Sequence, residues 1–76
     1  MPEPEKLVLV LYTTHQTMMV EKILKESKIM HTLISKPPEA NPGCGIAICF
    51  FKKDREKIVK LLQNENIDYE GIYFEE

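Results

Sequence analysis

The chain has 76 residues and a net charge of −2, with 43% of its residues hydrophobic and 29% charged. These values are typical of one small globular domain, and they exclude the clustered basic excess of a nucleic-acid-binding protein. Two cysteines are too few for a disulfide scaffold, and no apolar run is long enough for a signal peptide or a membrane span. We therefore expect a cytoplasmic protein with reduced thiols, in which residues 1–5 form a short Pro-Glu leader and residues 6–76 form one domain.

The first half of the domain is expected to contain a strand, a helix and a second strand. Residues 7–12 are apolar at both parities, which is typical of a strand covered on both faces. Thr13 is a suitable N-cap for the following helix, with Gln16 as its capping-box partner, and Thr14 is an equally suitable cap. The apolar face of this helix comprises Met19, Val20, Ile23 and Leu24. Residues 31–35 are expected to form the second strand.

The second half is expected to contain a loop, a strand, a helix and a last strand. Residues 36–43 include three prolines, which hold this loop out of any strand ladder, and residues 45–51 form the third strand. Asp54 is expected to cap the second helix. The apolar face of that helix comprises Ile58, Val59, Leu61 and Leu62. Residues 67–74 form the last strand, in which Gly71 marks a bulge or a close approach.

The order of these elements predicts an α+β fold. The succession β-α-β-β-α-β is that of the ferredoxin-like two-layer sandwich, with a four-stranded antiparallel sheet and two helices on one face. Right-handed crossovers place the first and third strands in the centre of the sheet and the other two at its edges. The two strands assigned to the centre are also the most apolar.

Cys44 is the main candidate for chemistry because it lies between Gly43 and Gly45, where no neighbouring side chain shields it. The first and third strands are antiparallel in the predicted fold, so Cys44 should lie beside Thr13 and Thr14, where the first helix begins. A helix N-terminus favours an anion, so the pKa of this thiol is expected to be lower than that of a free cysteine. The structural alternative is that Cys44 is a small buried residue.

The remaining candidates for chemistry are weaker. His15 lies in the first turn of the first helix, either as a base or charge partner for a thiolate or as an exposed surface histidine. Cys49 should point to the sheet face opposite Cys44 and be inert core, and His31 is expected to be structural or exposed. We expect no metal and no cofactor, because the chain lacks short-spaced ligand pairs. A basic group forms either a solvated helix face or a docking patch for an acidic partner: Lys52, Lys53, Arg55, Lys57 and Lys60.

The chain resembles a family of short, mostly bacterial domains known as selenium/sulfur-carrier-like proteins. The resemblance is carried by residues 12–15 with 20–22, by 37–39 with 44–47, and by 54–55 with 67–73. It implies a cysteine that holds sulfur or selenium as a persulfide or perselenide, and by motif match this residue is Cys44. The family usually has an arginine where this chain has Pro38, so Lys36 is the residue that would supply that positive charge.

Two hypotheses of different classes follow. In the first, Cys44 accepts a sulfur or selenium atom from a donor enzyme of the cysteine desulfurase type and passes it to an acceptor enzyme. The chain is then a carrier and not an independent enzyme. In the second, the chain is a non-catalytic protein-interaction or dimerisation module, and Cys44 is structural. We also expect a homodimer, since both central strands are apolar on both faces and the face without helices should expose an apolar patch.

Overall fold

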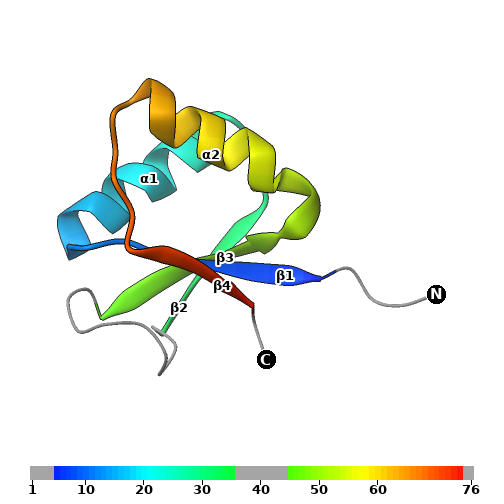
Figure 1. The fold of residues 1–76 in the computed structure, drawn as a ribbon, viewed down its shortest axis with the longest axis horizontal. Helices are drawn as coiled ribbons and strands as arrows, with labels where there is room; N and C mark the ends of the chain where they lie inside the picture. The colour runs from blue at the N-terminus through cyan, green and yellow to red at the C-terminus, as the bar shows by residue number, and fades with distance from the viewer. Residues whose placement is uncertain (1–4, 36–44, 75–76) are drawn as a thin grey trace.

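The computed structural model describes residues 5–35 and 45–74, which fold into a sheet and two helices arranged in two layers (Figure 1). The elements in chain order are β1 (Lys6–Val10), α1 (Thr14–Glu26), β2 (His31–Ser35), β3 (Ile46–Phe51), a 3₁₀ turn η1 (Lys52–Asp54), α2 (Arg55–Asn64) and β4 (Gly71–Phe74). This succession and the two-layer arrangement confirm the predicted α+β, ferredoxin-like architecture.

The sheet has the strand order β2-β3-β1-β4, and every neighbouring pair is antiparallel. The two apolar strands β1 and β3 therefore lie in the centre, as predicted. In the register of the sheet, Leu9 of β1 is opposite Ile48 of β3 on one side and Ile72 of β4 on the other. Ile48 is in turn opposite Leu33 of β2. One row of side chains thus crosses all four strands on the same face.

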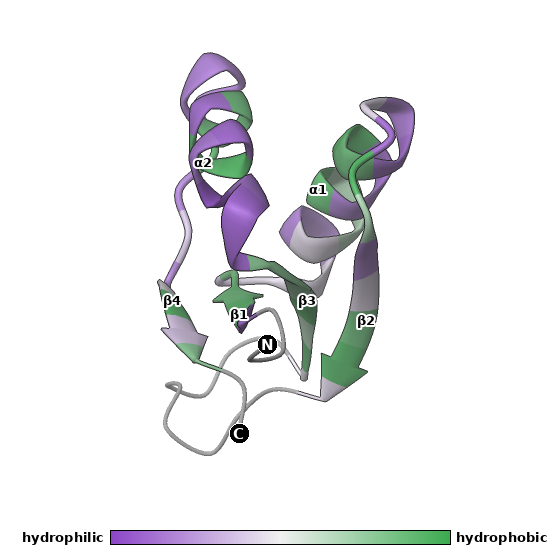
Figure 2. Cartoon of the chain, turned by 90° about the vertical axis from the view of Figure 1, so that its right-hand side faces the viewer, coloured by the Kyte–Doolittle hydropathy of each residue, from purple (hydrophilic) through white to green (hydrophobic). Residues whose placement is uncertain are grey.

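The main core lies between this face of the sheet and the helices, and Figure 2 shows α1 and α2 on the same side of the strands. Its buried members are Leu7, Leu9, Leu11, Val20, Leu24, Ile48, Phe50, Ile58 and Leu62. Alternation along β1 and β3 directs every second residue toward the helices. The burial of these residues is the main stabilising contribution to the fold.

The opposite face of the sheet carries a smaller apolar cluster. Val8, Val10 and Ala47 are 2%, 1% and 0% exposed, and Ile34 and Tyr73 pack against them. The expectation of an apolar face is therefore confirmed, but the expectation that it is exposed is wrong for these three central residues. The side chains of strands β2 and β4 flank this cluster because those strands extend the sheet on either side. Homodimer formation stays a prediction.

Helix α1 begins as the sequence predicts, but its buried face is shifted. Val20 and Leu24 are fully buried and Ile23 is half-buried, whereas Met19 is 43% exposed and its assignment to the core was wrong. Thr17 takes that place in the core with no exposed surface. Its hydroxyl donates a hydrogen bond of 3.0 Å to the carbonyl oxygen of Thr13, so this buried polar group is satisfied.

Helix α2 and strand β4 also differ from the expectation in detail. Asp54 occupies the N-cap position of α2, but its side chain makes no capping hydrogen bond, and the turn η1 precedes the helix. Strand β4 begins at Gly71 instead of residue 67. A Cβ atom at Gly71 would lie 3.2 Å from the ring of Tyr73, so the predicted close approach at this glycine is confirmed.

His31 is the first residue of β2, and its side chain contacts helix α1. Its Nε2 lies 2.9 Å from a carboxylate oxygen of Glu21, and its Nδ1 lies 2.7 Å from the carbonyl oxygen of Ile29. Both ring nitrogens thus face oxygen acceptors, and both contacts are hydrogen bonds when the ring carries two protons. Of the two expectations for His31, structural or exposed, these contacts favour the structural one.

Candidate functional site

The candidate site lies where the end of β1, the start of α1 and the start of β3 meet. Because β1 and β3 are antiparallel neighbours, paired at Leu9 and Ile48, the last residues of β1 and the first residues of β3 lie at the same end of the sheet. Helix α1 starts at Thr14, four residues after β1 ends. Figure 1 shows the first turn of α1 and the start of β3 at the same end of the molecule. The end of β1, the start of α1 and the start of β3 thus lie at one end of the molecule, while the position of Cys44 beside them stays a prediction.

Thr13 fixes the start of α1. Its backbone is extended, and its side-chain oxygen accepts a hydrogen bond of 3.1 Å from the backbone N–H of Gln16. The reciprocal half of the predicted capping box is not formed, because the Oε1 atom of Gln16 is buried without a hydrogen-bond partner among the described residues. Thr13 is therefore the cap, and the alternative of Thr14 as the cap was wrong.

The described residues around this helix start are open to solvent. Thr13, Thr14 and His15 are exposed, and Tyr12 is 54% exposed. Gly45 is exposed as well, and a Cβ atom built on it would meet no heavy atom of another described residue within 4 Å, its chain neighbours apart. The described residues at this end of the sheet are thus accessible to solvent.

Tyr12 lies next to the helix cap but was not among the predicted site residues. It follows an apolar run and was assigned to the first strand, whereas β1 ends at Val10 and Tyr12 lies in the connection to α1. The available signal was its position next to the helix cap, where a residue leaves the sheet. An exposed aromatic residue beside a helix start is suited to contact a partner or a ligand.

Three of the predicted site residues lie outside the described residues: Lys36, Gly43 and Cys44. Their predicted roles stay predictions: Lys36 as the supplier of positive charge, Gly43 as a neighbour without a side chain to shield the thiol, and Cys44 as the reactive thiol. The structure describes Gly45, the residue that follows Cys44, and the strand that begins at Ile46.

Cys49 is separate from the candidate site. It is 7% exposed and lies in the middle of the sheet, opposite Val8 on β1 and Thr32 on β2. The prediction that Cys49 is buried is therefore confirmed. Within residues 5–35 and 45–74, no group of three or more His, Cys, Asp or Glu side chains is arranged to hold a metal ion.

Comparison with protein families identifies the chain. Residues 6–74 match the model of the family described as "Putative Se/S carrier protein-like". The chain belongs to this family. The match covers every helix and strand of the fold. No curated protein and no solved structure matches the chain. In the part of the chain that the structure describes, no helix has both the length and the apolar character needed to cross a membrane.

Proposed function

We propose that this protein carries a sulfur or selenium atom on Cys44, as a persulfide or perselenide, between a donor enzyme and an acceptor enzyme. The observation that carries the proposal is the family match over residues 6–74. The fold supports it, because the chain that follows Cys44 enters the sheet at the end where α1 begins. The positive end of a helix dipole there stabilises a thiolate or a persulfide anion.

The proposed transfer is a thiol exchange without net oxidation. The Cys44 thiolate attacks the outer sulfur of a persulfide on the donor, a new S–S bond forms on Cys44, and the S–S bond of the donor breaks. The donor cysteine leaves as a thiolate. In the second step a thiolate of the acceptor attacks the outer sulfur on Cys44, the S–S bond on Cys44 breaks, and Cys44 leaves as a thiolate. Selenium in place of the outer sulfur follows the same scheme.

Such an exchange requires that a second cysteine can reach the thiol of Cys44. The attacking sulfur must approach in line with the S–S bond, so a donor enzyme has to bring its own cysteine against Cys44. The open space at Gly45 and the exposed side chains of Tyr12 and His15 leave room for this approach. The partners in this proposal are a cytoplasmic donor of the cysteine desulfurase type and an acceptor enzyme, and the chain has no independent catalytic activity.

Alkylation with iodoacetamide tests the premise that Cys44 is the reactive thiol. We expect the wild type and Cys49→Ser to be labelled rapidly and Cys44→Ser slowly, because Cys49 is 7% exposed. Equal labelling rates in all three proteins would contradict the proposal and favour a binding module with a structural cysteine. Homodimer formation is tested separately, by sedimentation equilibrium at micromolar concentration.

A further inference from the structure

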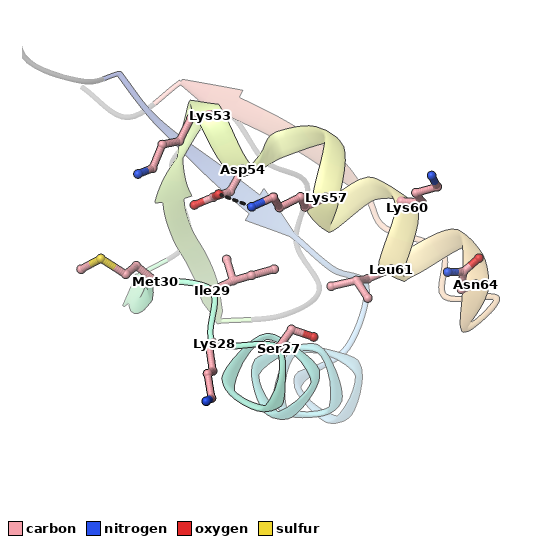
Figure 3. Close-up of a pocket in the computed structure, with 10 residues that line it drawn as sticks. All are labelled: Ser27, Lys28, Ile29, Met30, Lys53, Asp54, Lys57, Lys60, Leu61 and Asn64. Atoms are coloured by element: carbon pink, nitrogen blue, oxygen red, sulfur yellow. Dashed lines mark ion pairs between the residues drawn. The ribbon is translucent and has the colours of Figure 1, made fainter.

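A groove lies between the end of α1 and helix α2, on the helix side of the molecule (Figure 3). Its volume of ≈ 510 Å³ is within the range of about 300–1,000 Å³ that is usual for binding sites. One wall is the segment that follows α1, and the other is η1 with α2. Helix α1 spans about 20 Å, so the groove is at the opposite end of this helix from the candidate site.

The floor of the groove is apolar. Ile29 from the segment after α1 and Leu61 from α2 point toward each other in Figure 3. Both are partly buried and pack against the main core, so their positions are fixed by the fold. They offer a small apolar contact surface at the bottom of the groove, and the exposed side chain of Met30 lies at its edge.

The rim of the groove is basic. Four lysines line it, against a single carboxylate: Lys28, Lys53, Lys57 and Lys60, with Asp54. Asp54 is 4.0 Å from Lys57, which balances that one lysine. Lys28 and Lys60 make no ion pair with any residue in the described ranges, and Lys53 lies over the ring of Phe51 at 5.9 Å. The whole chain carries a net charge of −2, so the positive charge of this rim is a local feature.

The ammonium groups do not converge on one point. In Figure 3 the side chains of Lys28 and Lys60 point away from the floor, from opposite walls of the groove. Lys53 lies in η1 and Lys60 in α2, so their backbones are separated by about 11 Å at the rises of a 3₁₀ turn and an α-helix. A single small anion therefore reaches only one or two of these groups. An extended chain with several carboxylates matches their spacing better.

We propose that this groove binds an acidic, extended segment of a partner protein. Its carboxylates pair with Lys28, Lys53 and Lys60 at the rim, and one apolar side chain between them contacts Ile29 and Leu61. Complementary charge of this kind accelerates encounter and fixes the orientation of a partner. Because the groove and the start of α1 are at opposite ends of the helix, a partner bound here leaves the candidate site open. The proposal does not depend on the chemistry of Cys44.

Titration with a synthetic peptide tests this proposal. The probe is an acetylated peptide of glutamates around a single leucine, followed by the amide chemical shifts of the ¹⁵N-labelled protein. We expect shifts confined to the groove, and a dissociation constant about five-fold weaker for the double variant Lys28→Asn, Lys60→Gln. Asparagine suits position 28 because the backbone there has φ 58°. The control Lys22→Gln, Lys25→Gln removes the same charge from the exposed surface of α1 and should bind the peptide as the wild type does.

Three outcomes would overturn the proposal. Equal weakening in the control variant would mean non-specific attraction to any lysine surface. Equal affinity for the same peptide with glutamine in place of glutamate would mean that charge is not recognised. Pyrophosphate binding as tightly as the peptide, at the same residues, would identify a small-anion site instead of a protein-docking groove.

Discussion

The hydrogen bond between His31 and Glu21 should make a measurable contribution to the stability of the fold. The two atoms are 2.9 Å apart, and the side chains are only 11% and 25% exposed. The contact joins α1 to the edge strand β2, two elements that follow each other through a short connection. Replacing either residue with alanine should therefore lower the free energy of unfolding.

The expected coupling energy between His31 and Glu21 lies between those of exposed pairs and of buried pairs. Exposed ion pairs contribute about 0.2–1 kcal/mol, whereas removing one partner of a buried pair costs about 3–5 kcal/mol. For this partly buried pair we expect a coupling energy of about 1–2 kcal/mol. The chain supplies a comparator in Lys52 and Glu5, which are 3.1 Å apart and both 58% exposed. Their coupling should be below about 0.5 kcal/mol.

A double-mutant cycle measures this coupling directly. Urea unfolding is followed for the wild type, His31→Ala, Glu21→Ala and the double variant in one buffer. The contact of His31 with the carbonyl oxygen of Ile29 is lost in both variants that lack His31, so it cancels from the cycle. A coupling no larger than that of Lys52 with Glu5 would refute the account of this contact.

Three further predictions concern α1. Thr13→Ala removes the acceptor for the first-turn N–H and should cost about 1 kcal/mol, or about 4–8 °C in Tm, whereas Thr13→Ser should be close to the wild type; equal Tm values for both would contradict the capping role. Gln16→Met removes a buried acceptor that has no partner among the described residues, so its Tm should be unchanged or higher, and a clear fall would show that this oxygen is bonded. Leu24→Ala should cost about 2–5 kcal/mol in urea unfolding because Leu24 is fully buried, whereas Met19→Ala should change stability by less than about 0.5 kcal/mol; similar losses would contradict the assigned orientation of α1.

Much of the fold could be predicted from the sequence, because its determinants are local. The second strand has the predicted bounds, residues 31–35, and the apolar runs of β1 and β3 identified the centre of the sheet. Where the prediction failed, the packing of α1 on the sheet decides, because the helical period does not distinguish Met19 from Thr17 at the margin of the buried face. Thr17 can be buried there because its hydroxyl donates to the carbonyl oxygen of Thr13, four residues earlier in the same helical turn.

Of the candidate site, only the backbone elements that surround it could be predicted. The helix cap at Thr13 and the antiparallel pairing of β1 with β3 follow from local signals and from topology. The hydrogen bond between His31 and Glu21 could not be predicted, because Glu21 is ten residues earlier and meets His31 only after α1 has packed on the sheet. The groove likewise requires that Lys28 and Ile29 meet α2, although the basic residues of α2 alone had suggested a docking patch as one alternative.

The most direct test of the carrier function is the intact mass of the protein after incubation with a cysteine desulfurase and cysteine. We predict an increase of about 32 Da, one sulfur atom, in the wild type and in Cys49→Ser, and its removal by a reductant such as dithiothreitol. Cys44→Ser should show no increase under the same conditions. An adduct that persists in Cys44→Ser, or an unmodified wild type with several unrelated sulfur donors, would contradict the proposal that Cys44 carries the atom.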